Sequence, residues 1–531
     1  MRDWTREHPH ATVVALAVAA FIALTAWWVS ADQRLPGGGD PGRHLASALD
    51  FADDLGDLDV VGLVTERADA GSGFFYPPLA RFVAGVPAAF GLEVTDWGVL
   101  AVNLVFVPML AAGCFLVGRR LYGPLAGLLA ALFALVTPMV LDLFHVLVID
   151  APLAATIALT LWAFLASERF SRRRESVLAG ALLGVAVMVK TTAPIFLVGT
   201  VAVMLARGGW RQWRNIGLAA AAALVVAAPW HIIHAGDITN VSGQAPGGLS
   251  PAGLGGEEIS ATDDFIIRLT DYFWVGVNLQ YFLPLALLFA VGLVYAIREL
   301  RTRRDLPELL AGIAFAYLFF ALAISLRDPR YTLPLVVFVA VIATGWIAVT
   351  RSRALRGAGI GLLAAAALLN VIAVSSSALD AERISLPGDE VNIGWRAQPG
   401  TLTVFDDTGY IGGPPQEDPF WTELFDAAVA EGLRPAVVRI RAASELGADH
   451  LGFLVLAREH GMRETTFARH RPEHPDLRVN VWEGPDDYWV GILGLPEPCA
   501  RIPDGIPPRP LAITVERYED GGYRPWCDFL V

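Results

Sequence analysis

The sequence predicts an α-helical polytopic membrane protein with about eleven transmembrane helices, followed by a small extracytoplasmic α/β domain. Of the 531 residues, 54% are hydrophobic and only 18% are charged, which is more apolar surface than one soluble core of ordinary composition needs. The apolar residues also gather in runs of about 17–25, which are long enough to cross a bilayer core of about 30 Å. A bilayer is therefore the expected surrounding of most of the chain.

The apolar runs predict a series of spans joined by polar segments. The first run continues through Trp27 and Trp28 into a polar loop without a clear small-residue cleavage site, so we expect it to be retained as a span. The fifth and sixth runs are short, as tilted or partly re-entrant segments are. In chain order the predicted spans are residues 11–30, 97–117, 122–141, 147–166, 177–190, 192–206, 215–233, 279–297, 308–326, 332–350 and 357–378.

Arginine clusters predict the orientation of these spans. All clusters fall on one side of an eleven-span chain, together with the amino terminus, and the positive-inside rule makes that side the cytoplasm. The chain is thus expected in the cell membrane, with the loops 31–96 and 234–278 and the tail outside the cytoplasm. The clusters are Arg119–Arg120, Arg169–Arg174, Arg207–Arg214, Arg298–Arg304 and Arg351–Arg356.

The chain is expected to divide into a transmembrane part, residues 1–379, and a soluble α/β domain, residues 380–531. The net charge is −13, and the stretch 380–531 holds 26 acidic residues against 14 arginines, so the acidity belongs to the tail and argues against a nucleic-acid partner. Short strand-like runs at 402–405, 436–440 and 479–482 alternate there with a helix-like segment at 421–431. Cys499 and Cys527 either pair there or are free thiols.

Acidic and aromatic residues mark the outer segments. Asp40 lies about ten residues beyond the first span, with His44 one helical turn later, and its carboxylate either works at the membrane surface or caps a helix. Tyr76 opens a Tyr-Pro-Pro-Leu turn, as an interface anchor or as a substrate contact. Asp150, at the mouth of the fourth span, is functional or a cap. His145 is expected in an exposed loop.

Two cationic segments run against the positive-inside trend. Lys190 is the only lysine among 40 basic residues and ends the fifth span, and Arg327, Arg330 and Tyr331 open the tenth. A cation on the outer side needs a local reason. It either reaches lipid headgroups or binds a phosphate or pyrophosphate near the bilayer surface, where it would stabilise charge on a leaving phosphoryl group.

Taken in order, these segments resemble the polytopic glycosyltransferases of superfamily C, in particular the branch with protein O-mannosyltransferases and the lipid A aminoarabinose transferase. The resemblance covers roughly the first 350 residues. One departure is Pro41, since many relatives carry Asp-Glu where this chain has Asp-Pro. Lys190-Thr191 resembles the Thr-Lys-Gly segment of that branch, although Val189 replaces the threonine and Thr191 the glycine. The four matching segments are Asp40, Tyr76-Pro77-Pro78-Leu79, Asp150-Ala151-Pro152-Leu153 and Arg330-Tyr331-Thr332-Leu333-Pro334.

The resemblance implies transfer of a sugar, a hexose or a pentose, with inversion at the anomeric carbon. The donor would be a polyprenyl-phosphate-linked sugar in the lipid membrane, and the acceptor an extracytoplasmic protein, lipid or glycan. Asp40 would be the general base, oriented by His44 if His44 does not hold the acceptor. Lys190, Arg330 and Arg327 would hold the lipid phosphate. Tyr76, Asp150 and Tyr331 would shape the pocket. No cofactor is firmly implied, although a divalent cation on Asp40 and Asp150 is left open.

Two other classes of function compete with this interpretation. A secondary transporter or flippase for a lipid-linked or anionic substrate would place polar groups near the bilayer midplane and often shows paired repeats, whereas here they lie at helix ends and no repeat is visible. A degenerate transferase fold could also serve as a sensor or scaffold, with the acidic tail as its interaction surface. We expect Asp40, Tyr76, Asp150, Lys190 and Arg330 to line one cavity at the membrane boundary.

Overall fold

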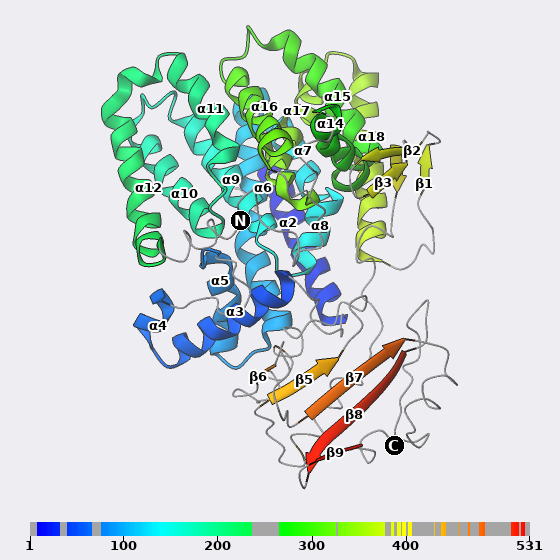
Figure 1. The fold of residues 1–531 in the computed structure, drawn as a ribbon. Helices are drawn as coiled ribbons and strands as arrows, with labels where there is room; N and C mark the ends of the chain where they lie inside the picture. Colours follow the sequence, from blue (N-terminus) through cyan, green and yellow to red (C-terminus); the bar gives the residue numbers. More distant parts are fainter. Residues whose placement is uncertain are drawn as a thin grey trace.

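The structure, a computed structural model, describes residues 8–31, 40–65, 76–235, 265–324 and 328–376, together with the nine strands of the tail named below and residues 430 and 455. Arg327, Cys499, Cys527 and most of the segment 421–431 lie outside the described residues. Among the described residues every helix of more than one turn precedes every strand (Figure 1). The α-helical polytopic class is therefore confirmed.

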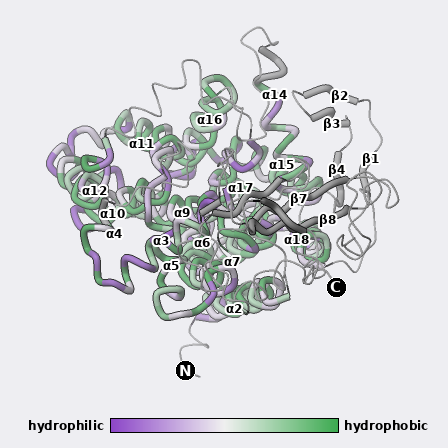
Figure 2. The backbone as a smooth tube through the Cα atoms, turned by 60° about the horizontal axis from the view of Figure 1, so that its bottom comes forward, coloured by the Kyte–Doolittle hydropathy of each residue, from purple (hydrophilic) through white to green (hydrophobic). Residues whose placement is uncertain are grey.

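Helices form the first part of the chain, and Figure 2 shows hydrophobic residues along most of their length. They are α2 (Pro9–Ala31), α3 (Asp40–Gly56), α4 (Val60–Thr65), α5 (Leu79–Ala89), η1 (Val94–Gly98), α6 (Val99–Tyr122), α7 (Pro124–Leu135), α8 (Pro138–His145), α9 (Asp150–Ala166), α10 (Arg173–Val189), α11 (Ile195–Ala206), η2 (Gly209–Gln212), α12 (Trp213–Ile233), α14 (Phe265–Val275), η4 (Gly276–Gln280), α15 (Phe282–Glu299), α16 (Leu306–Ala323), η5 (Pro329–Leu335), α17 (Val336–Val349) and α18 (Arg353–Ser375).

Each of the predicted spans coincides with a helix or a pair of helices. Among the described residues, seven helices are long and apolar enough to cross a membrane. The number becomes eight if α7 and α8, which are bent by 56° at a short break, form one span. The break falls at Pro138, which lacks the N–H group that a continuous helix would need there. Helices α9 and α11 are apolar but shorter, so the prediction of eleven crossings stays a prediction.

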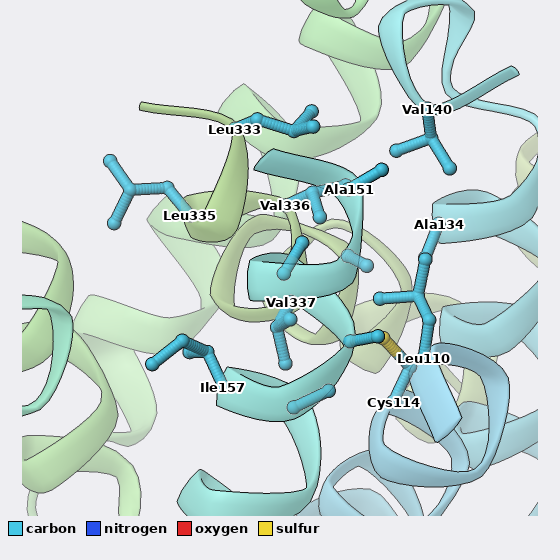
Figure 3. Packing of buried hydrophobic residues seen from close by; sticks show 14 of the residues in the cluster. Leu110, Cys114, Ala134, Val140, Ala151, Ile157, Leu333, Leu335, Val336 and Val337 are labelled. Carbon is cyan, nitrogen blue, oxygen red and sulfur yellow. The ribbon is translucent and has the colours of Figure 1, made fainter. Parts of the chain in front are cut away.

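Helices α9 and α17 form the centre of the bundle. Fifteen of the 17 residues of α9 are buried. In the segment Pro329–Val349, which contains α17, 89% of the 18-residue apolar stretch is buried. Figure 3 shows how side chains of neighbouring helices pack there, among them Leu110, Ile157 and Val337. Both central helices begin with predicted site residues, because Asp150 opens α9 and Arg330 lies in η5, the turn that leads into α17. The core therefore fixes the position of the site.

The arginine-rich loops lie at the other ends of the same helices. Helix α9 begins at Asp150 and runs into the loop 167–172, and α10 returns from Arg173 to end one residue before Lys190. The buried carboxylate of Glu308 joins these loops, because it accepts from Arg169 at 3.1 Å and from Arg207 at 2.9 Å. The predicted site and the arginine clusters are thus at opposite ends of the bundle.

Helices α3, α4 and α5 lie together at one end of the bundle (Figure 1). Helix α3 packs against α5, and α5 packs against η1 and α6, so the loop between the first two long helices is folded back onto the bundle. Helix α3 carries Asp40 at its start, and α5 follows directly after the Tyr76 segment. This packing brings two predicted site segments close to the start of α9.

The tail contains a five-stranded mixed sheet in the order β6-β5-β7-β8-β9, with β5 parallel to β6 and β7 and the other pairs antiparallel. Val479 of β7 is opposite Val515 of β8. The runs predicted at 402–405, 436–440 and 479–482 are all strands, whereas the division into two domains stays a prediction. The strands are β1 (Ile384–Leu386), β2 (Glu390–Ile393), β3 (Arg396–Pro399), β4 (Leu402–Phe405), β5 (Val437–Arg441), β6 (Thr466–Phe467), β7 (Leu477–Glu483), β8 (Leu511–Glu519) and β9 (Gly522–Pro525).

Close helix packing at a glycine predicts a matched pair of substitutions. A Cβ atom at Gly199 in α11 would lie 2.0 Å from the carbonyl oxygen of Ala311 in α16, so Gly199→Ala must push the two helices apart. We expect a loss of stability of about 1–3 kcal/mol, seen as a lower melting temperature in detergent. The control is Gly217→Ala in α12, where a Cβ meets no described atom within 4 Å. That variant should melt at the wild-type temperature or slightly above it, because alanine favours the helix. Equal melting temperatures of the two variants would contradict this account.

Candidate active site at the ends of the helices

A buried ion pair joins the ends of α9 and α10. Lys190 Nζ lies 2.7 Å from Asp150 Oδ1, and the two residues are only 8% and 3% exposed. Asp150 lies in the first turn of α9, and Lys190 follows the last residue of α10 in an extended backbone conformation. The N-cap residue of α9 is Ile149, so Asp150 lies inside the helix and does not occupy the capping position. Its observed partner is the lysine.

A second ion pair joins α3 to η5. Arg330 Nη2 donates to Asp40 Oδ2 at 3.1 Å, and Arg43, one turn after Asp40, lies 3.7 Å from Asp40 Oδ1. The Oδ1 atom is buried and accepts no hydrogen bond from any residue that the structure describes. A carboxylate oxygen without a donor keeps its lone pairs available. Asp40 is therefore able to accept a proton from a group that enters the site.

Aromatic rings connect the two ion pairs. The ammonium of Lys190 lies 4.9 Å from the ring centroid of Tyr331 and 5.9 Å from that of Tyr76, within the range of cation–π attraction. The ring of Tyr76 in turn contacts the ring of His44 edge to face, with 5.4 Å between centroids. All predicted site residues that the structure describes thus converge, although they come from α3, the 76–78 segment, α9, α10 and η5.

His44 is held neutral inside this cluster. It is buried, and burial together with the charges of Arg81, Arg330, Lys190 and Arg43 lowers its pKa well below the usual value. Within the described residues it makes no hydrogen bond to Asp40, so the expectation that it orients the base is not supported. Its ring packs on Tyr76 instead. His44 therefore contributes shape and a neutral polar edge, without a second positive charge.

Tyr76 faces the cluster, which favours a site role over an anchor in the lipid interface. Burial and the carboxylate of Asp40 raise the pKa of its hydroxyl, so it remains protonated. Its backbone carbonyl accepts from Arg81, whose other nitrogen donates to Ser47 Oγ of α3 at 2.8 Å. Arg81 thus fastens the Tyr76 segment to the helix that carries Asp40.

Three charged residues of the site were not predicted. Arg43 stands three residues after Asp40, a spacing that brings two side chains together on a helix. Arg81 gave no signal in the sequence. Asp328 accepts from Arg330, and its position in an Asp-Pro-Arg sequence is typical of a capping residue before a turn. With these residues the cluster holds three carboxylates and four cations, which favours binding of an anion.

The prediction for His145 was wrong. We expected an exposed loop residue, but its ring is buried at the end of α8 and stacks on Trp28 with 4.5 Å between centroids. Its Nε2 atom lies 3.4 Å from Ser375 Oγ of α18. The physical reason is the bend between α7 and α8, which turns the end of α8 toward α2 and α18.

The side chains of the cluster offer few free ligands for a metal ion. No group of three or more histidine, cysteine, aspartate or glutamate residues that could hold a metal occurs in the part of the chain that the structure describes. Asp40 and Asp150 are each ion-paired with a cation of the protein. A divalent ion would have to displace those cations, so we assign no step to a metal.

An apolar cavity of about 290 Å³ lies between α3, α4, α5, α10 and α12. It adjoins the charged cluster at Phe51, because the Arg81 guanidinium lies 5.9 Å from the centroid of the Phe51 ring. All residues that line it are apolar: Phe51, Leu63, Pro78, Leu79, Phe82, Val185, Met188 and Val226. The charged residues converge beside this cavity, and a common cavity lined by the predicted site residues themselves stays a prediction.

Comparisons with known proteins concern the family and the fold of the chain. Residues 76–233 match the family model of the dolichyl-phosphate-mannose-protein mannosyltransferases, a range that includes Tyr76, Asp150 and Lys190. The fold is similar to that of ArnT from Cupriavidus metallidurans bound to undecaprenyl phosphate, at 19% identity over 94% of this chain and 98% of that chain, with a TM-score of 0.55. The apo state of that protein gives 18% identity over 95% and 98%, with a TM-score of 0.56. No curated protein matches the chain significantly. The resemblance to the superfamily C glycosyltransferases is confirmed, and the chain has their fold.

The Lys190–Asp150 pair predicts a double-mutant cycle. Lys190→Met leaves a buried carboxylate without its cation and Asp150→Asn leaves a buried ammonium without its anion, so each should destabilise the protein by about 3 kcal/mol. The double variant should recover part of the melting temperature, because no buried charge is left without a partner. It should recover none of the activity, because the positive charge of Lys190 is still missing. The control is Glu299→Gln, which breaks the ion pair between Glu299 and Arg303. The side chains of that pair are 29% and 30% exposed, so its loss should change the melting temperature little. Additive effects in the cycle would show that the pair does not couple.

The neutral state of His44 predicts a pH profile. Since its pKa is well below the usual value, His44 is deprotonated across the range of about pH 6–8 in which an ordinary histidine titrates. The ratio of the activity of His44→Gln to that of the wild type should therefore be constant across this range. A ratio that changes around pH 6.5 would show that His44 titrates in the site.

Proposed function

We propose that the chain is an inverting glycosyltransferase that moves a sugar from a polyprenyl-phosphate donor to an extracytoplasmic acceptor. The observation that carries the proposal is the convergence of one carboxylate, Asp40, with two cations, Lys190 and Arg330, from three distant segments of the chain. A general base and a phosphate-binding pair at one place are the groups that such a displacement needs.

The reaction is a single displacement at the anomeric carbon. Asp40 takes the proton of the acceptor hydroxyl, the hydroxyl oxygen forms the new bond to the anomeric carbon, and the bond from that carbon to the phosphate oxygen breaks. The electron pair of the broken bond leaves with the polyprenyl phosphate, whose growing charge Lys190 and Arg330 stabilise. One base suffices, which supports the assignment although the neighbouring residue is Pro41.

The surroundings of the cluster support a lipid-linked donor. The apolar cavity beside Lys190 suits an isoprenoid chain, whereas the cations suit its phosphate. The ArnT structure to which the fold is similar contains undecaprenyl phosphate. Such a donor reaches the site from the bilayer, which fits a cluster at the ends of membrane helices.

The orientation follows from the two ends of the bundle. The arginine-rich loops and the amino terminus lie in the cytoplasm, and the site, the loops 31–96 and 234–278 and the domain 380–531 lie outside it, in the cell membrane. This orientation is supported by helices α9, α10 and α17, because each has the site at one end and an arginine cluster at the other. In this orientation the acidic tail is on the same side of the membrane as the acceptor.

Replacement of the base tests the proposal. In a strain that lacks the gene, mass analysis of cell-envelope glycans should reveal the missing sugar, and the wild-type gene should restore it. Asp40→Asn keeps the shape of the side chain but cannot take a proton, so we expect transfer to fall about 10²–10⁴-fold. The purified variant should still bind undecaprenyl phosphate, measured by native mass spectrometry.

The controls separate an enzyme from a carrier. Lys190→Met combined with Arg330→Met should lose the binding of undecaprenyl phosphate, and Asp305→Asn, which breaks an ion pair with Arg120 at the arginine-rich end, should behave as the wild type. Membrane levels of each variant are compared by immunoblot. Full transfer by Asp40→Asn, or movement of a lipid-linked substrate without any glycan product, would refute the glycosyltransferase and favour a transporter.

A further inference from the structure

Asp328 holds Arg330 more tightly than Asp40 does. Arg330 Nη2 donates to Asp328 Oδ2 at 2.5 Å, and its Nε atom lies 3.1 Å from both carboxylate oxygens of Asp328. Asp328 Oδ1 also accepts from the backbone N–H of Arg330 at 2.9 Å. Since Nη2 reaches Asp40 Oδ2 at 3.1 Å as well, one nitrogen bridges two carboxylates.

The turn that presents these groups is fixed from a second side. Gln280, at the end of η4, donates to the carbonyl of Pro329 at 2.5 Å and to Thr332 Oγ1 at 2.8 Å. Helix η4 is a π-helix, and Phe282, two residues later, has a φ of +55°, which a bulky side chain rarely adopts. Strained backbone of this kind persists where the surrounding structure holds it in place. The turn therefore keeps Arg330 between its two acids.

Asp328 itself is not placed for chemistry on a substrate. Among the residues that the structure describes, the Asp328 carboxylate hydrogen-bonds to the backbone and side chain of Arg330 alone. These bonds lower the pKa of the Asp328 carboxyl in spite of its burial, so Asp328 is ionised. An ionised carboxylate at this distance offsets much of the arginine charge that a phosphate or Asp40 would otherwise meet. Its effect on the reaction must pass through Arg330.

We propose that Asp328 is a positioning residue that divides the charge of Arg330, limiting its hold on the lipid phosphate and on Asp40 so that the phosphate can leave and the base stays strong. This inference rests on the proposed function. It predicts that loss of the Asp328 charge has opposite effects on binding and on turnover, which a merely structural residue would not produce.

The direction of each effect follows from charge. In Asp328→Asn the full positive charge of Arg330 acts on the lipid phosphate, so binding of undecaprenyl phosphate should tighten about fivefold. The same charge stabilises ionised Asp40, which makes it a weaker base, so the rate of transfer should fall about tenfold. The acidic limb of the pH profile of kcat/KM should move to lower pH, because Asp40 then loses its proton more readily.

The other charged and titratable groups that face Asp40 must stay constant in this comparison. Asp328→Asn leaves all of them in place. They are Arg43 and His44 on α3, Tyr76, Tyr331 beside Arg330, and the Asp150–Lys190 pair.

The experiment measures both effects on the full-length protein. Binding of undecaprenyl phosphate is followed by native mass spectrometry, and initial transfer rates are followed in membrane vesicles of the deletion strain, which contain the endogenous donor. Asp328→Glu, which restores the charge, should return both values toward those of the wild type. The matched control is Asp305→Asn, which removes an aspartate from an arginine pair at the opposite end of the bundle and should change neither value.

A second uncharged variant guards against misfolding. Asp328→Ser keeps a hydroxyl that can cap the turn, and it should reproduce the tighter binding and slower transfer. Weaker binding together with slower transfer, no change in either, or loss of folded protein in both uncharged variants would overturn the inference. If the wild type transfers sugar normally while these results are found, only the role of Asp328 fails. If the wild type neither binds undecaprenyl phosphate nor transfers sugar, the proposed function fails and the inference falls with it.

Discussion

The pairing of buried charge at the ends of membrane helices is the constraint on which the site depends. An unpaired ammonium or carboxylate at this depth is costly, so each must find a partner of opposite charge. Lys190 finds Asp150 at 2.7 Å, and Arg330 finds Asp328 and Asp40. Because the Lys190–Asp150 and Arg330–Asp40 pairs each join two separate elements, the ion pairs that neutralise these charges also hold the helix ends in register. The interactions that form the site at this end of the bundle are therefore also interactions that stabilise the fold there.

Much of this could be predicted from the sequence. The length and composition of the apolar runs predict the helices, and the arginine clusters separate one end of the bundle from the other. Lys190 attracts notice because no other lysine occurs in the chain, and Arg330 because a cation there contradicts the arginine pattern. Such signals locate a residue along the membrane normal. They say little about which helices are neighbours, and the order of the motifs in a known superfamily supplied that information.

The parts that could not be predicted depend on side-by-side packing. In the sequence of α8, Asp142 and His145 stand three residues apart on one polar face, a pattern that predicts an outward histidine and gives no sign that His145 turns inward onto Trp28. Arg81 likewise resembles any basic residue of an outer loop until α5 is seen to pack on α3. The spacing of Asp328 from Arg330 could have predicted a contact between these two residues. The sequence could not predict that one nitrogen of Arg330 also donates to Asp40, because Asp40 lies 288 residues before Asp328 in the chain.

The two cations differ in how readily they can exchange partners. The side chain of Lys190 is 10% exposed and lies against two aromatic rings, whereas that of Arg330 is 24% exposed and divides its donors between two carboxylates. An anion that enters the site can replace one acceptor of a guanidinium while the planar fork keeps its other bonds, but a compact ammonium has a single strong partner to give up. In the proposed reaction, Arg330 would follow the phosphate as it binds and leaves, and Lys190 would define where the phosphate lies. A guanidinium that gave one donor to the phosphate would give up its bond to Asp40 while it kept its bonds to Asp328. Binding of the donor and activation of the base would then be linked through one side chain.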